Sequence, residues 1–118
     1  MPYVDGFVLA VPKANLEAYK EMARVGGSVW MEHGALSYVE CFADDVPYGE
    51  LTSFPRAVQA KDDEVVVFSW ITYPDRASRD AINAKVMADP RLKPENYDPM
   101  PFDGKRMIFG GFQSFLEL

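Results

Sequence analysis

The sequence predicts an α+β domain in which two helices lie against a four-stranded antiparallel sheet. Four apolar, strand-like runs and two helix-like stretches follow one another in the order β-α-β-β-α-β, which is the ferredoxin-like arrangement. The strand-like runs are apolar on both faces: residues 65–71, VVVFSWI, have no polar side, and residues 3–11 contain one charged residue, Asp5. Because the helices can cover only one face, we expect a second copy of the chain to cover the other.

The first strand covers roughly residues 3–11 and ends at Pro12, because proline cannot continue a hydrogen-bonded ladder. The helix that follows has Asn15 as its candidate N-terminal cap. Apolar residues recur along it at helical spacing, namely Leu16, Tyr19, Ala23 and Trp30.

Glycines mark the middle and the end of this first helix. The pair Gly26-Gly27 weakens it by roughly 1 kcal/mol per glycine relative to alanine. The usual compensation is a close approach of the backbone to a sheet or a ligand. Gly34 is expected to end the helix in the left-handed conformation.

Two strands and a second helix follow the first helix. The second strand is expected over residues 35–42 and the third over residues 64–72. Pro74 and Asp75 then open a second helix, which Pro90 ends.

The last part of the chain combines a loop and a strand. Residues 89–104 contain four prolines and little periodicity, which predicts an ordered surface loop. The final strand is expected from about residue 105 to residue 115. The pair Gly110-Gly111 in its middle indicates a bulge or a close backbone contact.

Length and composition indicate a single domain, residues 1–118, with 48% hydrophobic residues. The formal charge of −6 disfavours binding to nucleic acid or anionic membranes, because the Lys and Arg residues are scattered rather than gathered in a patch. Cys41 is the only cysteine, so no disulfide can form within the chain. No signal peptide and no apolar run of about 20 residues is recognisable, and the expected location is the cytosol.

Six sequence blocks resemble the YbaA-like family of bacterial proteins: GALSYVEC (34–41), ADDVP (43–47), TSFP (52–55), DEVVVFSW (63–70), KVMADPR (85–91) and MPFDGKRM (100–107). The resemblance covers nearly the whole chain. This family is classed as domain of unknown function 1428 within the dimeric α/β-barrel superfamily. The resemblance therefore implies a dimeric α/β barrel, and it brings no agreed catalytic residues with it.

Three residues are candidates for catalysis: His33, Glu40 and Arg106. His33, the only histidine, lies at the predicted end of the first helix, where it either finishes the helix or acts as a general base. Glu40 and Cys41 must point to opposite faces of their strand, and Cys41 is a poor candidate nucleophile without an activating cluster. Glu40 needs a partner, for which Arg106 or Lys105 is the natural candidate, in a structural ion pair or a functional site.

Other residues are candidates for ligand binding. Asp103 and Lys105 lie where the loop enters the last strand, and either fix the loop or anchor an anionic ligand. Tyr38 and Trp70 belong to an aromatic sheet surface, which is either core and dimer interface or partly a pocket for a flat apolar ligand.

No metal site or cofactor is predicted. With one His and one Cys, a structural zinc site within one chain is disfavoured. The aspartates Asp44 and Asp45 have turn character rather than the spacing of a calcium loop. Glycine-rich phosphate loops and haem-attachment motifs do not occur.

Three functions remain open from the sequence. The first is a ligand-binding protein or enzyme acting on a small, apolar or aromatic molecule, with a pocket lined by Trp70 or Tyr38 and reached by His33 or Arg106. The second is a non-catalytic dimeric module with a stress-related or scaffolding role. The third, least favoured by the acidic composition, is association with RNA.

Overall fold

The computed structural model describes residues 2–118 and has the predicted order of elements. The strands are β1 (Tyr3–Pro12), β2 (Ser37–Phe42), β3 (Glu64–Tyr73) and β4 (Ile108–Gln113). The α-helices are α1 (Leu16–Glu32), the short α2 (Phe54–Ala57) and α3 (Arg76–Met87). Single 3₁₀ turns cover Lys13–Asn15, Pro90–Leu92, Pro94–Asn96 and Gly104–Arg106.

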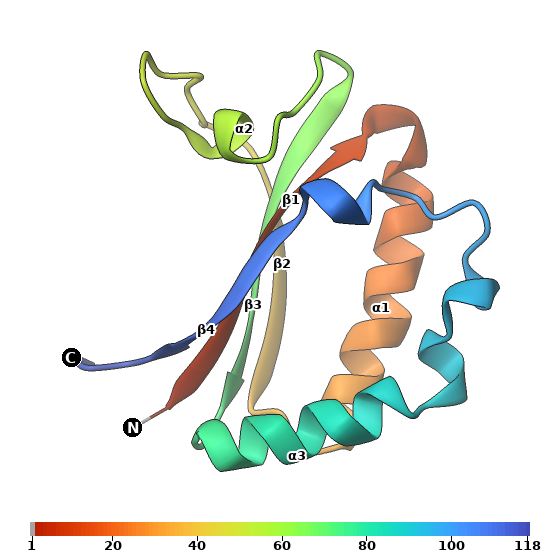
Figure 1. Ribbon diagram of the computed structural model, residues 1–118, viewed down its shortest axis with the longest axis vertical. Helices are drawn as coiled ribbons and strands as arrows, with labels where there is room; N and C mark the ends of the chain where they lie inside the picture. The colour runs from red at the N-terminus through yellow and green to blue at the C-terminus, as the bar shows by residue number, and fades with distance from the viewer. Residues whose placement is uncertain (1) are drawn as a thin grey trace.

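The four strands form one antiparallel sheet in the order β2-β3-β1-β4. Figure 1 shows α1 on one side of this sheet, α3 across its lower end, and α2 near its upper end on the opposite side. The fold therefore confirms the predicted ferredoxin-like class. We call the side that faces α1 the inner face and the opposite side the outer face.

Two details differ from the sequence-based expectations. Asn15 makes no side-chain cap of α1, because its Nδ2 instead donates a hydrogen bond to the Pro101 carbonyl at 3.1 Å. The last strand begins at Ile108 rather than near residue 105. The reason is the preceding 3₁₀ turn, where the Lys105 amide donates to Asp103 Oδ1 at 3.0 Å.

Strand register assigns each side chain to a face. On β1 and β3 the pairs Leu9↔Val67 and Tyr3↔Tyr73 lie on the inner face, where α1 and α3 bury them. The outer face is buried at its upper end, where Val58 from the segment after α2 packs with Val8, Ala10 and Val66. Apolar side chains thus occupy both faces, as predicted.

The rest of the outer face has little cover from within the described chain, where Phe54 of α2 meets Phe68 with 5.8 Å between the ring centroids. Phe68, Ile108 and Phe112 are 43%, 46% and 65% exposed there. They surround a shallow apolar depression together with Val4, Gly6, Val8 and Trp70. An apolar surface of this kind is typical of a protein–protein interface.

Glycines allow two close features around α1. A Cβ added at Gly27 would lie 2.7 Å from Tyr38 Cδ1, so the glycine brings α1 against β2, as expected from the Gly26-Gly27 pair. Gly34 has φ +112°, which confirms its predicted role in ending the helix.

Candidate functional site

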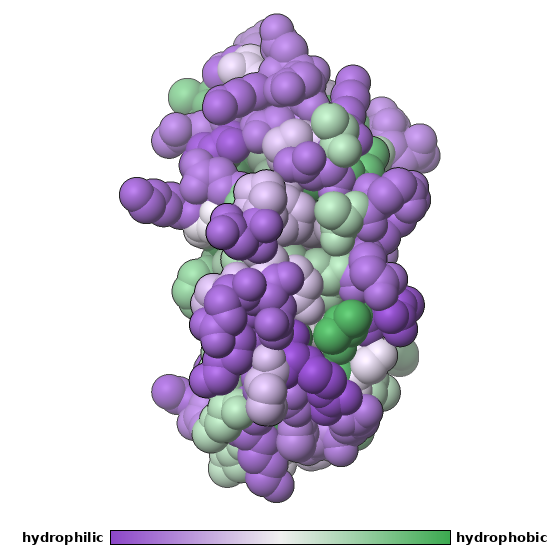
Figure 2. All heavy atoms as spheres, turned by 90° about the vertical axis from the view of Figure 1, so that its right-hand side faces the viewer, coloured by the Kyte–Doolittle hydropathy of each residue, from purple (hydrophilic) through white to green (hydrophobic). Residues whose placement is uncertain are grey.

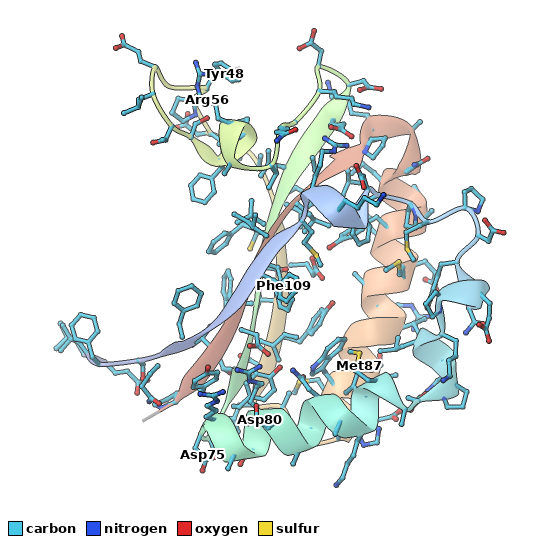
Figure 3. All side chains as sticks on the ribbon, viewed as in Figure 1. Tyr48, Arg56, Asp75, Asp80, Met87 and Phe109 are labelled. Carbon is cyan, nitrogen blue, oxygen red and sulfur yellow. The ribbon has the colours of Figure 1, made fainter. Side chains whose placement is uncertain are left out.

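A cavity of about 250 Å³ lies between the inner face of the sheet and α1. The segment that follows α3 closes it on the far side, and most of its wall is apolar: Phe7, Leu9, Met22, Ala23, Gly26, Trp30, Ile71, Met87, Leu92, Pro94, Met100, Phe102 and Met107. Figure 3 shows Met87, one of the lining residues, at the α3 end of this space, and Phe109, which is not one of them, on β4. We call this space the Glu40 cavity, after the carboxylate that lines it.

Glu40 is the one acidic residue that lines the cavity, and two tyrosines hold its carboxylate. The Tyr19 hydroxyl donates to Oε1 at 2.7 Å, and the Tyr38 hydroxyl donates to Oε2 at 2.7 Å. No ion pair to Glu40 is found among residues 2–118. A carboxylate can accept about four hydrogen bonds, so acceptor capacity remains on both oxygens.

The three side chains meet because of local sequence rules. Tyr38 and Glu40 are two residues apart on β2 and therefore share the inner face. Tyr19 comes from α1, one turn before Ala23 on the same helix face, and the close approach at Gly27 sets α1 near enough for its hydroxyl to reach β2.

Burial and the neighbouring carboxylate keep both tyrosines protonated. Burial of the Tyr19 ring raises the pKa of its hydroxyl well above the ordinary value, and the charge of Glu40 raises it further. The pKa of Tyr38 is raised for the same two reasons. Both hydroxyls are therefore neutral donors, and their protons are already committed to Glu40.

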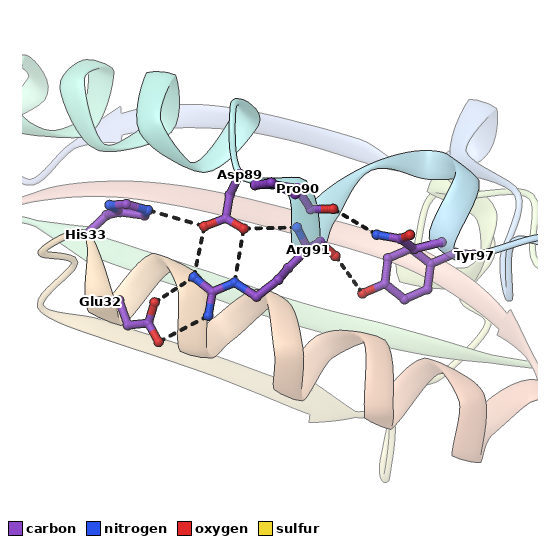
Figure 4. A network of polar contacts seen from close by, with 7 residues as sticks. Glu32, His33, Asp89, Pro90, Arg91 and Tyr97 are labelled. Atoms are coloured by element: carbon purple, nitrogen blue, oxygen red, sulfur yellow. Dashed lines mark hydrogen bonds and ion pairs between the residues drawn. The ribbon is translucent and has the colours of Figure 1, made fainter.

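The segment that closes the cavity is fastened to the end of α1 by a charged network (Figure 4). Arg91 donates to Glu32 Oε2 at 2.6 Å and to Asp89 Oδ2 at 2.8 Å. These contacts lower the pKa of both carboxyl groups. The Tyr97 hydroxyl, which lies on the cavity side of the segment, donates to the Arg91 carbonyl at 3.2 Å. The network fixes the position of the cavity wall.

His33 belongs to this network and does not line the cavity. It is the residue that follows α1, and its Nε2 lies 3.6 Å from Asp89 Oδ2 without a hydrogen-bond partner of its own. The structure therefore places it at the helix end, away from Glu40.

The predicted pairing of Glu40 with Arg106 or Lys105 is wrong. Arg106 donates to both oxygens of Glu64, at 2.8 and 2.7 Å, and its Nε donates to Asp103 at 3.0 Å. Glu40 lies on β2 and Arg106 precedes β4, and these strands form opposite edges of the sheet. Three strand spacings, about 14 Å, separate such edges, which is too far for an ion pair.

Asp103, Lys105 and Trp70 also lie outside the cavity. Asp103 caps the 3₁₀ turn before β4 and accepts from Arg106, whereas Lys105 is exposed. Trp70 pairs with Gly6 and Val39 on the outer face. Of the pocket expected to be lined by Trp70 or Tyr38 and reached by His33 or Arg106, the cavity contains Tyr38 and none of the other three. Cys41 shares that outer face, opposite to Glu40 as predicted.

The sequence reasoning missed Tyr19 and Trp30 as cavity residues. Both appeared only as members of the helical apolar pattern of α1, and Trp30 lines the cavity while its Nε1 donates to Asn83 at 3.0 Å. The signal that could have found them is the glycine pair, because residues one turn (Trp30) or two turns (Tyr19) along the helix from a close helix–sheet approach face the sheet.

Within residues 2–118, no group of three or more His, Cys, Asp or Glu side chains is arranged to hold a metal ion. No described helix has both the length and the apolar character needed to cross a membrane. Seen from the side of α1, most of the surface is hydrophilic, with small groups of apolar residues scattered among the polar ones (Figure 2).

Sequence comparison finds a family model described as a protein of unknown function, DUF1428, which matches residues 2–104. The protein called Uncharacterized protein YbaA in Escherichia coli K12 is 56% identical over 117 residues, covering 99% of each chain. The protein of the same name in Shigella flexneri is equally similar, with 56% identity over 99% of each chain.

Solved structures share the fold at low sequence identity. Rv0793 from Mycobacterium tuberculosis matches with a TM-score of 0.59 and 12% identity, over 99% of this chain and 98% of that one. A dimeric ferredoxin-like protein from an uncultured marine organism matches with a TM-score of 0.57 and 16% identity, over 95% and 92% of the two chains.

Proposed function

The chain belongs to the DUF1428 family, and we propose that it binds a small apolar or aromatic molecule in the Glu40 cavity and works as a homodimer. The observation that carries the proposal is an apolar cavity with one acidic side chain held at a fixed position. Ligand sites have this composition, with apolar walls and few polar groups that orient the ligand.

The size of the cavity supports a ligand of one or two rings. An apolar cavity of about 150 Å³ is known to accept benzene. A volume of about 250 Å³ leaves room for a ring with a short side chain. Aromatic residues in the wall, among them Phe7, Trp30 and Phe102, suit a flat ligand.

Proton transfer is the chemistry that the site could add to binding. Glu40 is the only carboxylate among the lining residues, and free acceptor capacity on its oxygens makes it a candidate general base. A ligand proton within hydrogen-bond reach of Glu40 would be the one transferred.

The bare outer face supports the homodimer. A twin sheet over Phe68, Ile108 and Phe112 would cover the side chains that the chain itself leaves exposed. Specific dimers bury about 800 Å² per partner, which is the scale of one face of a small sheet. The same face also favours the second candidate function, a non-catalytic dimeric module whose role is the interface itself.

Tryptophan fluorescence separates the two candidates. Trp30 lines the cavity and Trp70 lies on the outer face, so the Trp70→Phe variant leaves Trp30 as the only tryptophan. We expect its emission to change saturably on titration with 2-phenylethanol, because the ligand contacts the indole.

Ala23→Leu in the Trp70→Phe background is the matched control. Ala23 projects from α1 into the cavity, and leucine is a good helix former, so the added side chain fills the space while the helix is kept. The proposal predicts that this variant keeps its thermal unfolding midpoint and loses the fluorescence response. An unchanged response in the filled variant, or no response in either protein, would favour the non-catalytic module.

A further inference from the structure

The Glu40 carboxylate carries a charge that nothing in the cavity balances. No Lys, Arg or His is among the described residues that line the cavity. The groups that contact the carboxylate are two neutral phenols. Tyrosine donors stabilise the charged form of a carboxylate but leave its net charge in place.

The basic residues nearest to Glu40 among those described border the cavity from outside, and the Lys20 Nζ lies 5.4 Å from the centre of the Phe42 ring on the same face of β2. Lys20 and Arg24 line a surface groove that shares Tyr38 and Glu40 with the cavity. Each is paired along the helix, Lys20 with Glu17 at 3.3 Å and the Arg24 Nε with Glu21 at 3.0 Å. Both cations are therefore paired with glutamates of α1 rather than with Glu40.

The walls beside the carboxylate suit a cation. Ring centroids of Trp30 and Tyr38 are 6.0 Å apart, and those of Tyr19 and Phe102 are 5.7 Å apart. Aromatic faces attract ammonium groups, most strongly where water is excluded. The acidic chain, with a formal charge of −6, also raises the local concentration of cations around the molecule.

We infer that the ligand of the Glu40 cavity is a small aromatic amine bound as its ammonium ion, with the cation on Glu40 and the ring against the apolar wall. This inference rests on the proposed function. The ammonium supplies hydrogen-bond donors to free acceptor positions on the carboxylate. A ligand carboxylate would instead face Glu40 at close range and would find no free donor from Tyr19 or Tyr38, whose protons bind Glu40.

Folding has already removed part of the water from Glu40. The carboxylate is half-buried in the folded chain, so folding has met part of its desolvation cost and ligand binding adds the rest. The larger cost of binding is the desolvation of the incoming ammonium, which the carboxylate and the aromatic rings offset. The net preference for the amine over a neutral analogue is therefore expected to be about ten-fold or more in Kd.

Four probes of one skeleton test the inference in the wild-type protein by isothermal titration calorimetry at pH 7. These are 2-phenylethylamine (a cation), 2-phenylethanol (a neutral donor), ethylbenzene (no polar group) and phenylacetate (an anion). The expected order of affinity is amine, alcohol, ethylbenzene, phenylacetate. An alcohol that binds as tightly as the amine, or phenylacetate as the tightest ligand, overturns the inference while the proposed function stands.

Glu40→Gln removes the charge at nearly the same shape, and Glu50→Gln makes the same change in an exposed turn. The amine should lose about ten-fold in affinity with Glu40→Gln and be unchanged with Glu50→Gln. Ethylbenzene binding should be the same in all three proteins. If Glu40→Gln does not fold, the order of the four probes on the wild type decides alone. If none of the four binds to the wild type, the proposed function itself fails, and the inference fails with it.

Discussion

On the inner face of the sheet, Leu9, Val11 and Val67 are at most 2% exposed beneath α1. On the outer face, Phe68, Ile108 and Phe112 remain between 43% and 65% exposed. Because the side chains on both faces are apolar, the difference in exposure comes from the segments of the chain that pack on each face. The inner cover leaves a cavity with a fixed carboxylate, whereas the outer cover ends at Val58 and leaves a flat apolar surface.

The comparison separates two kinds of function within one sheet. A concave apolar space with a single charge selects a small ligand by its shape and charge. An open apolar surface has no such selectivity and suits a large, flat partner such as a second copy of the sheet. Glu40 and Cys41, adjacent on β2, belong to these two different sites.

The largest expected effect concerns the outer face. Phe68→Asp places a charge on the proposed dimer interface, once in each protomer, and should weaken the dimer by about 100-fold or more. Phe42→Asp is the matched control, because Phe42 is 42% exposed against 43% for Phe68 but lies on the inner side of β2. Sedimentation velocity at micromolar concentration should show monomer for the first variant and dimer for the second. Monomer for the wild type would contradict the whole interpretation of this face.

A smaller effect, on the pH dependence of stability, is expected at Arg106. Arg106 donates to Glu64 and to the Gln59 carbonyl in the segment after α2, and so joins the outer cover to the loop before β4. Hydrogen bonds from Arg106 lower the pKa of Glu64 to about 2. The ordinary glutamate pKa is about 4.3. Because the folded pKa is depressed, the contribution to stability is complete above about pH 6 and is lost as the pH falls toward 2.

Glu64→Gln tests this clasp. The free energy of unfolding of the wild type should fall by about 2 kcal/mol more than that of the variant between pH 6 and pH 3. Urea denaturation at a series of pH values measures how the free energy of unfolding changes with pH in each protein. Asp62→Asn, an exposed carboxylate two residues away, should follow the wild type. If the free energies of unfolding of the wild type and of Glu64→Gln changed equally with pH, the ion pair between Arg106 and Glu64 would not stabilise the fold.

The sequence was enough for the fold and for the existence of two apolar faces. Order of elements, the helix end at Gly34 and the opposite directions of Glu40 and Cys41 all follow from local rules of spacing and backbone geometry. The close approach at Gly27 follows from the cost of glycine in a helix.

The members of the site did not follow from the sequence, for two physical reasons. Residues 65–71 are apolar at every position, so alternation could not tell that Trp70 lies on the outer face. Strand order is a property of the folded chain, so the opposite-edge positions of Glu40 and Arg106 were hidden. Arg106 forms its hydrogen bonds with Glu64, and the donors to Glu40 are the hydroxyls of Tyr19 and Tyr38.

The smallest effect is expected from substitutions at two adjacent glycines of α1. They compare two neighbouring positions of the helix that covers the inner face. A Cβ at Gly27 would lie 2.7 Å from the Tyr38 ring, whereas one at Gly26 would meet nothing closer than 3.8 Å. Gly27→Ala should therefore cost about 1–2 kcal/mol by overpacking, displace Tyr38 from Glu40 and weaken amine binding. Gly26→Ala should stabilise the protein by up to about 1 kcal/mol, because alanine is the better helix former. Chemical denaturation of both variants measures the difference, and equal stabilities would show that α1 does not press on β2 at this point.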